Sequence, residues 1–402
     1  MVDIVSKINP KLAPILDRAL SGQSLDLDEG YALIESDASQ LTTLMWAASE
    51  LRNNTQQTRK ITYSRKIFLP LTNLCRDRCG YCTFVKGPEQ SGAHTMSPDE
   101  VLKVARQGQS LGCKEALLSL GDHPEYRHPE ILDTLREFGF NSTIDYVAAM
   151  SRLILEETGL LPHTNCGLLD KDEISVIAPW NVSMGIMLES TSMALHNVGG
   201  AHYKTVTKAP MDRLNTLSNA GELGVAMTTG ILIGIGETHR DRVDSLMKIR
   251  QINEEYGNIQ EIIIQNFRAK NDTRMSAIPD ANVLDLLKTQ AVARLFMGAS
   301  MNIESPPNLN EESCQTYLLA GINDWGGISP LTKDFINPER AWPEVSKLRR
   351  LTSDAGFELR ERSALFPDYV SSGKWFTSSS VRQKVLDITS PDGYIKTDLE
   401  RW

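Results

Sequence analysis

The chain has 402 residues and a net charge of -9, and 41% of its residues are hydrophobic. This length suits one large domain or two ordinary ones, and the acidic balance argues against a nucleic-acid partner bound by phosphate neutralisation. The longest apolar run, residues 224–236, is too short to span a bilayer, and the N-terminus lacks the apolar core of a signal peptide. We therefore expect a cytoplasmic protein with no nucleic-acid or membrane partner.

The first 60 residues predict a helical N-terminal extension. Amphipathic patterns at 11–20 and 26–36 are typical of short helices, and the pattern at 39–60 is typical of a longer one. This stretch carries no motif that indicates chemistry. We interpret it as an extension that packs against the main domain.

From residue 66 onward, short apolar runs alternate with helical patterns. Ser97 followed by Pro98 is a typical helix start, and Gly112, Gly159 and Gly257 stand where helices should end. The apolar runs lie at 66–75, 115–122, 161–167, 181–190, 225–237, 261–269 and 301–308, and the helical patterns between them include 98–112, 144–159, 209–224, 239–257 and 282–299.

Alternating strands and helices predict a parallel sheet covered by helices. The number of units favours an α/β fold of the TIM type, a partial or complete (β/α) barrel, over a doubly wound sheet. In such barrels the chemistry lies at the carboxyl ends of the strands. We expect three parts: the extension at 1–60, a barrel domain at 61–370 and a C-terminal tail at 371–402.

Three of the six cysteines lie at the end of the first apolar run and in the loop after it, as Cys75-x3-Cys79-x2-Cys82. Thiolates bind zinc or iron-sulfur clusters. A structural zinc site uses four protein ligands, and a cubane cluster held by only three thiolates keeps one iron open for another ligand. His94, twelve residues after Cys82, is the alternative fourth ligand of a Cys3His zinc site.

This cysteine spacing, with Tyr81 before the last cysteine, resembles the signature of the radical S-adenosylmethionine (SAM) superfamily. The resemblance implies a radical SAM barrel in which Cys75, Cys79 and Cys82 hold one 4Fe-4S cluster. It also implies that SAM binds the open iron and that one-electron reduction cleaves SAM to methionine and a 5'-deoxyadenosyl radical. The backbone of Tyr81 is then expected near the adenine.

The second apolar run ends in residues 120–125, Leu-Gly-Asp-His-Pro-Glu. It resembles the second-strand motif that contacts the SAM amino group in this superfamily. The resemblance makes Gly121, Asp122 and Glu125 candidate cofactor-binding residues. The stretch departs from the usual Gly-Gly-Glu form, which leaves the contacting atoms open.

Two further runs supply the remaining candidates for SAM binding. Glu189 stands at the position that faces the ribose or the carboxylate, and Gly234 and Gly236 resemble the fifth-strand glycine motif beside the adenine. Each has an ordinary alternative: Glu189 as a salt-bridge partner, and the two glycines as a plain tight turn. The order of all these motifs at strand ends is what favours the SAM interpretation.

Residues 68–84, 230–242, 304–310 and 321–332 together resemble subunit 1 of the 7,8-didemethyl-8-hydroxy-5-deazariboflavin (FO) synthase family, over roughly 61–370. The implied reaction is that of a radical SAM carbon-nitrogen lyase that closes the deazaflavin ring. Its substrate is an adduct of 4-hydroxybenzyl and ribityliminouracil groups, supplied by the sister subunit 2, and ammonia is released. An electron donor such as ferredoxin or flavodoxin is also implied.

Three alternatives remain open on the sequence alone. They are the sister subunit that joins tyrosine to ribitylaminouracil, another radical SAM enzyme, and a zinc-binding scaffold without activity. In the late loops, Asp324 and Trp325 are candidates for substrate contact, or else form a turn with the tryptophan packed beneath it. The sequence identifies no catalytic acid or base.

Overall fold

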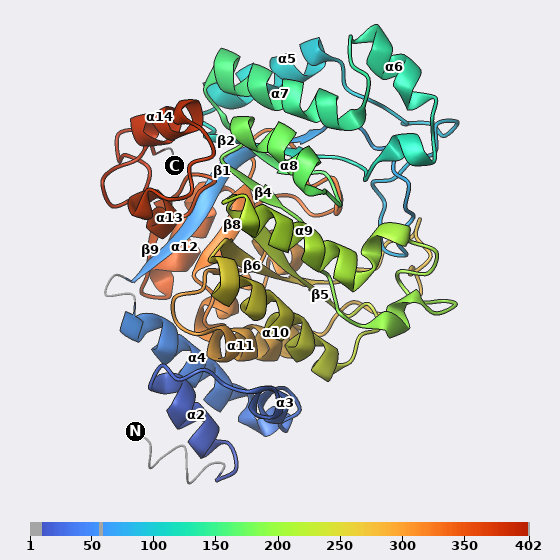
Figure 1. The fold of residues 1–402 in the computed structure, drawn as a ribbon. Helices are drawn as coiled ribbons and strands as arrows, with labels where there is room; N and C mark the ends of the chain where they lie inside the picture. The colour runs from blue at the N-terminus through green and yellow to red at the C-terminus, as the bar shows by residue number, and fades with distance from the viewer. Residues whose placement is uncertain (1–9, 56–58, 401–402) are drawn as a thin grey trace.

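Eight parallel strands form a closed barrel at the centre of the computed structural model, which describes residues 10–55 and 59–400 (Figure 1). Strands β2 to β8 lie side by side in chain order, and β1 closes the barrel by pairing with both β2 and β8. The predicted TIM-like barrel is therefore confirmed, and it is complete. The strands are β1 (Lys60–Pro70), β2 (Glu115–Ser119), β3 (Leu161–Asn165), β4 (Ser183–Gly185), β5 (Met227–Ile233), β6 (Ile259–Asn266), β7 (Ile303–Glu304) and β8 (Asp324–Ile328).

Helices cover the outside of the barrel, and their ends follow the local signals in the sequence. Ser97 and Glu100 form a capping box at the start of α5 (Pro98–Ser110), and Gly159 and Gly257 follow helices with positive φ angles of 70° and 72°. The other covering helices are α6 (Ile131–Glu137), α7 (Thr143–Thr158), α8 (Lys171–Ile177), α9 (Pro210–Glu222), α10 (His239–Tyr256), α11 (Val283–Met297) and α12 (Val345–Asp354).

The N-terminal extension consists of the helices α2 (Ala13–Leu20), α3 (Leu27–Ile34) and α4 (Leu41–Thr55), which lie against α10 and α11 (Figure 1). Arg52 on α4 is 1% exposed and donates a hydrogen bond of 2.8 Å to the carbonyl of Ile322, just before β8. The helical extension expected from the sequence is thus present and joined to the barrel. Residues 1–9 and 56–58 of that expected stretch lie outside the described residues.

The C-terminal residues add a ninth strand that the sequence did not predict. Strand β9 (Glu358–Glu361) pairs in parallel with the first half of β1. After it, α13 (Pro367–Ser372) and α14 (Ser379–Ile388) pack in a second apolar cluster with residues near β3, β4 and β5. Of the tail expected at 371–402, residues 401–402 are not described.

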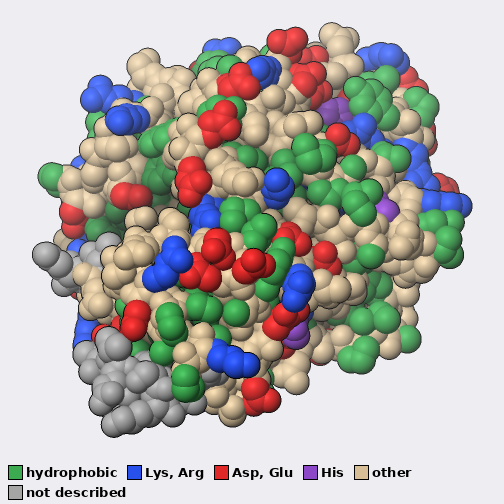
Figure 2. Space-filling model, turned by 60° about the horizontal axis from the view of Figure 1, so that its bottom comes forward, with side chains coloured by type: hydrophobic (Ala, Val, Ile, Leu, Met, Phe, Trp, Pro, Cys, Tyr) green, Lys and Arg blue, Asp and Glu red, His purple; other side chains and the backbone are tan. Residues whose placement is uncertain are grey.

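The surface combines charges of both signs. On the face shown in Figure 2, acidic and basic side chains lie among one another rather than in separate fields. No helix within the described parts of the chain is both long enough and apolar enough to cross a membrane.

Candidate functional site

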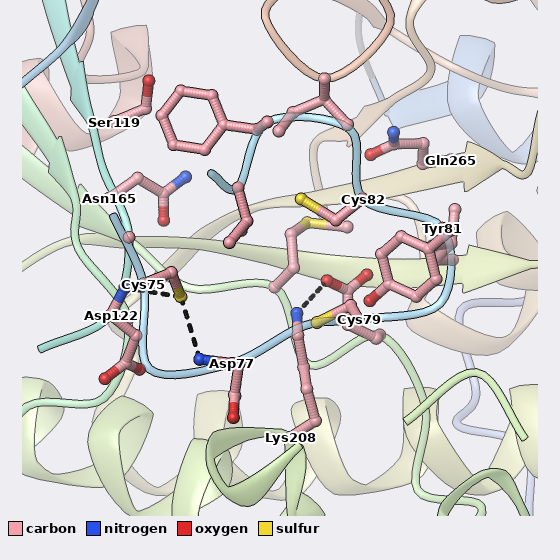
Figure 3. Close-up of a pocket in the computed structure, with 18 of the residues that line it drawn as sticks. Cys75, Asp77, Cys79, Tyr81, Cys82, Ser119, Asp122, Asn165, Lys208 and Gln265 are labelled. Carbon is pink, nitrogen blue, oxygen red and sulfur yellow. Dashed lines mark hydrogen bonds and ion pairs between the residues drawn. The ribbon is translucent and has the colours of Figure 1, made fainter. Parts of the chain in front are cut away.

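The three clustered cysteines lie in the loop that follows β1, at the carboxyl end of the barrel. They line one cavity of about 270 Å³, and Figure 3 shows their sulfur atoms around the same open space. Cys75 is buried, and Cys79 and Cys82 are half-buried. Tyr81 and Lys208 line the cavity beside them. The structure therefore brings the three thiols of the motif together.

Two contacts fix the loop between the cysteines. The Asp77 carboxylate accepts hydrogen bonds from the backbone N–H groups of Val206 (2.7 Å) and Thr207 (3.0 Å). The N–H of Gly80 donates to the carbonyl of Ala201 at 2.7 Å, and a Cβ at position 80 would lie only 3.1 Å from that oxygen. The positions of the cysteines thus depend on the segment after β4.

Burial favours the neutral form of two of the three cysteines, Cys75 and Cys79. Desolvation raises the pKa of Cys75 and of Cys79 to about 12. Two backbone N–H groups, those of Asp77 (3.4 Å) and Asp122 (3.2 Å), point at the Cys75 sulfur and oppose the effect of burial. A free nucleophilic cysteine needs a lowered pKa, whereas a metal ion supplies the charge that stabilises buried thiolates. The environment fits metal ligands.

The spacing of the sulfur atoms is too wide for a single zinc ion. Among the described residues, the only three ligand atoms of His, Cys, Asp or Glu found within 4.8 Å of one another belong to Glu261, Glu304 and Asp324. One zinc ion with Zn–S bonds of about 2.3 Å would hold its sulfur atoms about 3.8 Å apart. His94 instead has a side chain that is 53% exposed and lies 3.3 Å from Glu100. The three cysteines fit a larger group better than the Cys3His zinc alternative.

Comparison with known proteins supports the same interpretation. Residues 69–249 match the family model described as the radical SAM superfamily. The chain is 45% identical over 336 residues to the 7,8-didemethyl-8-hydroxy-5-deazariboflavin synthase of Methanopyrus kandleri. The alignment covers 84% of this chain and 100% of that relative. The chain belongs to this synthase family. Its cofactors are one 4Fe-4S cluster and SAM, which radical SAM enzymes bind.

Longer relatives and solved structures agree with this membership. The chain is 45% identical over 395 residues to the FO synthase of Mycobacterium leprae, covering 94% of this chain and 46% of that relative. It therefore spans about half the length of the FO synthases that it matches. The fold is also that of methylornithine synthase, with a TM-score of 0.67 and 18% identity over 86% of this chain and 97% of that one.

In this member of the synthase family, the end of β2 passes directly over the cysteine loop. A Cβ at Gly121 would lie 1.8 Å from the carbonyl oxygen of Leu74, so only glycine fits there. Asp122 lines the cavity, and its carboxylate lies 2.8 Å from Arg76 and 2.9 Å from His123. Burial would raise the pKa of Asp122, but His123 and Arg76 together lower it. Asp122 is thus an ionised residue that holds neighbouring loops.

Glu189 lines the same cavity in a strained backbone conformation. Its φ angle is +65°, which costs a residue other than glycine on the order of 1–3 kcal/mol. Its carboxylate lies 2.6 Å from Nζ of Lys208, and its carbonyl accepts a hydrogen bond from the N–H of Leu232. Glu189 is therefore a salt-bridge partner and a cavity residue at once.

Three predicted SAM contacts do not line the cavity. Glu125 accepts hydrogen bonds from the N–H (3.2 Å) and the hydroxyl (2.7 Å) of Thr143, at the start of α7. Gly234 and Gly236 lie in the turn after β5, with φ angles of +89° and +108°, whereas Leu232 on the same strand does line the cavity. Their roles toward SAM stay predictions.

A second cavity of about 230 Å³ lies within the barrel, beside the first. It extends along β2 from Ser119 at the carboxyl end to Glu115 at the start. Sequence reasoning did not find its charged residues, most of which lie at the start of or within the apolar runs. They are Lys66, Glu115, His163, Glu261, Glu304, Asp334 and Arg362.

Asp324 and Trp325 have separate roles in the structure. Trp325 is fully buried, and its indole N–H donates a hydrogen bond of 3.0 Å to Thr352. The packed tryptophan of the second alternative is therefore confirmed, but residues 324–328 form strand β8 rather than the expected turn. Asp324 instead lies inside the barrel and accepts hydrogen bonds of 2.7 and 2.9 Å from Arg362.

Proposed function

We propose that this chain closes the central ring of the deazaflavin chromophore, as subunit 1 of FO synthase. Its substrate is 5-amino-5-(4-hydroxybenzyl)-6-(D-ribitylimino)-5,6-dihydrouracil, and ammonia, 5'-deoxyadenosine and methionine are the other products. The observation that carries this proposal is the pair of adjoining cavities, one at the three cysteines and one inside the barrel. Both are lined by Ser119, Asn165, Met187, Gln265, Ile336 and Asn337.

The outer cavity is the proposed place of the cluster and SAM. Cys75, Cys79 and Cys82 would hold three irons, and Glu189 and Asp122 would help to position SAM. The reduced cluster, when bound, supplies the electron that cleaves SAM and starts the radical chemistry. The chain itself fixes the loop and shields the site within the barrel.

The inner cavity is the proposed place of the substrate. A uracil and a phenol offer flat faces and many hydrogen-bonding edges. Phe68 and Trp342, which both line this cavity, stack with ring centroids 5.1 Å apart and planes 7° apart. Asn165 and Gln265 lie where the two cavities meet and offer both donors and acceptors. These features suit a planar, polar molecule placed next to SAM.

Anaerobic reconstitution tests this proposal. Purified protein with about four irons and four sulfides per chain should form fluorescent deazaflavin from SAM, a reductant and the product of the sister subunit. The reductant stands in for a proposed donor such as ferredoxin or flavodoxin. Consumption of free tyrosine and ribitylaminouracil would instead identify the chain as the sister enzyme.

Cysteine variants test the cluster ligands. Cys79→Ala should abolish SAM cleavage by the reduced protein and lower the iron content. Cys314→Ala serves as the control, because Cys314 is buried in the main apolar core and does not line the cavity. Full iron content and SAM cleavage in Cys79→Ala would refute the assignment.

A further inference from the structure

Three buried carboxylates from neighbouring strands meet at the inner cavity. Glu261 on β6, Glu304 on β7 and Asp324 at the start of β8 have oxygen atoms within 4.8 Å of one another. Glu304 pairs with Asp324 across the sheet, and its exposed fraction is 8%. The sequence gives these three residues no common motif, and the cluster and SAM sites described above do not use them.

One guanidinium group binds two of the three carboxylates. Arg362 donates two hydrogen bonds to Asp324 and one of 2.9 Å to Glu261. Glu261 also accepts a hydrogen bond of 3.0 Å from the hydroxyl of Thr228. Because the guanidinium of Arg362 already lies among these carboxylates, the three carboxylates need no metal ion.

Glu304 is the carboxylate without a cation of its own. Among the described residues no ion pair joins it to a cation, and one of its oxygen atoms lies within 4.8 Å of oxygen atoms of Glu261 and Asp324. Burial and the neighbouring carboxylates of Glu261 and Asp324 hold the pKa of Glu304 well above its usual range. Two such carboxylates at close range share a proton, because both cannot be ionised together without a large cost. Glu304 is therefore the protonated member, and Glu261, bound by Arg362, is the ionised acceptor.

The other cation near Glu304 is Lys66, which only partly opposes the raised pKa of Glu304. Lys66 lies 2.7 Å from Glu115 and is paired with it. His163 is fully enclosed, and burial lowers its pKa to about 4, so it is neutral at pH 7. The interior thus holds more carboxylates than cations, which favours one bound proton.

The backbone of β8 leaves space for this arrangement. A Cβ at Gly326 would lie 2.0 Å from Oε1 of Glu304, and a Cβ at Gly327 would lie 2.1 Å from Cε of Lys66. The two glycines that follow Trp325 therefore allow two long charged side chains to lie against the strand. The position of Glu304 is determined by the shape of the barrel wall.

We propose that Glu304 and Glu261 form a proton-sharing pair, and that Glu304 gives the proton with which ammonia leaves the substrate. This rests on the function proposed above. Glu304 lines the inner cavity and so contacts the substrate there. An amine is a poor leaving group until it is protonated, and a carboxyl group that stays neutral at pH 7 can supply that proton.

The step is an elimination without a change of oxidation state. The bond between C5 of the dihydrouracil and its amino nitrogen breaks, and the bonding pair leaves with nitrogen. Glu304 donates a proton to that nitrogen, and ammonia departs. The adjacent benzylic carbon loses a proton, and its C–H electron pair becomes the new carbon-carbon double bond. The carboxylate pair accepts that proton and returns to its starting state.

The experiment measures 5'-deoxyadenosine, deazaflavin and ammonia separately, with reconstituted enzyme and an adduct carrying 15N in the amino group. Glu304→Gln can form hydrogen bonds but cannot donate a proton. It should form 5'-deoxyadenosine within about twofold of wild type, while deazaflavin and 15N-ammonia fall about 100-fold or more. A product that keeps the 15N label should accumulate. Glu304→Asp should recover part of the rate, and the surface control Glu312→Gln should behave as wild type.

A second readout reports the proton itself. The infrared band of an uncharged carboxyl should be present in wild type at pH 7, absent in Glu304→Gln, and lost as the pH rises through the raised pKa of Glu304. The deazaflavin rate of wild type should fall over the same range. The pH range of this change is set by Glu304 together with the polar and charged groups that face it. They are Lys66, Glu115, His163, Thr228, Glu261, Asp324 and Arg362.

Several results would overturn the proposal. Deazaflavin formation within threefold of wild type in Glu304→Gln would exclude Glu304 as the donor. Equal loss of 5'-deoxyadenosine and deazaflavin, with a raised KM for the adduct, would assign it to binding. If Glu304→Gln does not fold, absence of the uncharged carboxyl band in wild type would still refute the pair. Failure of wild type itself to convert the adduct would refute the proposed function instead.

Discussion

Arg362→Met should lower the free energy of unfolding by about 3–5 kcal/mol. The Arg362 side chain is 2% exposed, and it donates hydrogen bonds of 2.7 and 2.9 Å to Asp324 and one of 2.9 Å to Glu261. Methionine keeps much of the volume but leaves two buried carboxylates without their cation. Breaking a buried ion pair by removing one partner costs about 3–5 kcal/mol.

The loss should depend on pH in a defined direction. Burial already raises the pKa of Glu261 in the folded state and Arg362 opposes that rise, so without Arg362 the pKa of Glu261 rises further above its unfolded value. Protonation then relieves the unpaired charge, so the deficit should shrink as the pH falls from about 8 to about 5. The double variant Arg362→Met/Asp324→Asn should recover at least about 1 kcal/mol relative to Arg362→Met.

Urea unfolding of the cluster-free, reduced chain, followed by circular dichroism, measures these differences. The matched control is Arg152→Met, because Arg152 forms an exposed pair with Glu156 on α7 at 3.0 Å. That variant should lose less than about 1 kcal/mol. A loss below about 1.5 kcal/mol for Arg362→Met, or a loss that does not change with pH, would refute the reasoning.

Three further predictions concern the cofactor cavity, the barrel wall and pH. Lys208→Met removes the cation 2.6 Å from Glu189 and should weaken SAM binding about tenfold, equivalent to about 1.4 kcal/mol, in equilibrium binding; unchanged affinity would contradict this. Gly230→Ala would place a Cβ 2.2 Å from the carbonyl oxygen of Ile263, and its melting temperature should fall by several degrees. Burial alone would lower the pKa of His123, but hydrogen bonds to two carboxylates raise it to about 9, so its stabilising effect should be lost as the pH rises from about 6.5 to about 9. The variant His123→Gln should lose this dependence of stability on pH.

The barrel was predictable because its signals are local. Each apolar run and each helix cap, such as Ser97 with Glu100, lies within a few residues. Strand β9 was missed because only four residues, Glu358–Glu361, form it, and three of them are charged. Its pairing with β1 is a contact between distant parts of the chain, and periodicity does not encode such contacts.

The outer site was also partly predictable. Residues at the carboxyl ends of parallel strands meet, so Cys75, Asp122 and Glu189 could be expected near one another. The meeting of Glu261 and Glu304 could not be predicted from the sequence. A charged residue within an apolar run points inward or outward according to the register of the whole barrel. The sequence does contain one related signal, the pair Gly326-Gly327. The reason for glycine at position 326 becomes clear only when the structure shows Glu304 beside it.

The double pairing of β1 has a consequence for the order of events during synthesis. The strand and its cysteines leave the ribosome long before β8 and β9, with which the first half of β1 pairs. Val206 and Thr207, which hold Asp77, also come much later than the cysteines. The nascent chain must therefore carry an open strand edge and unsupported thiols until β8 and β9 have been made. Iron loading is expected to follow closure of the barrel, and slow or interrupted translation should increase aggregation.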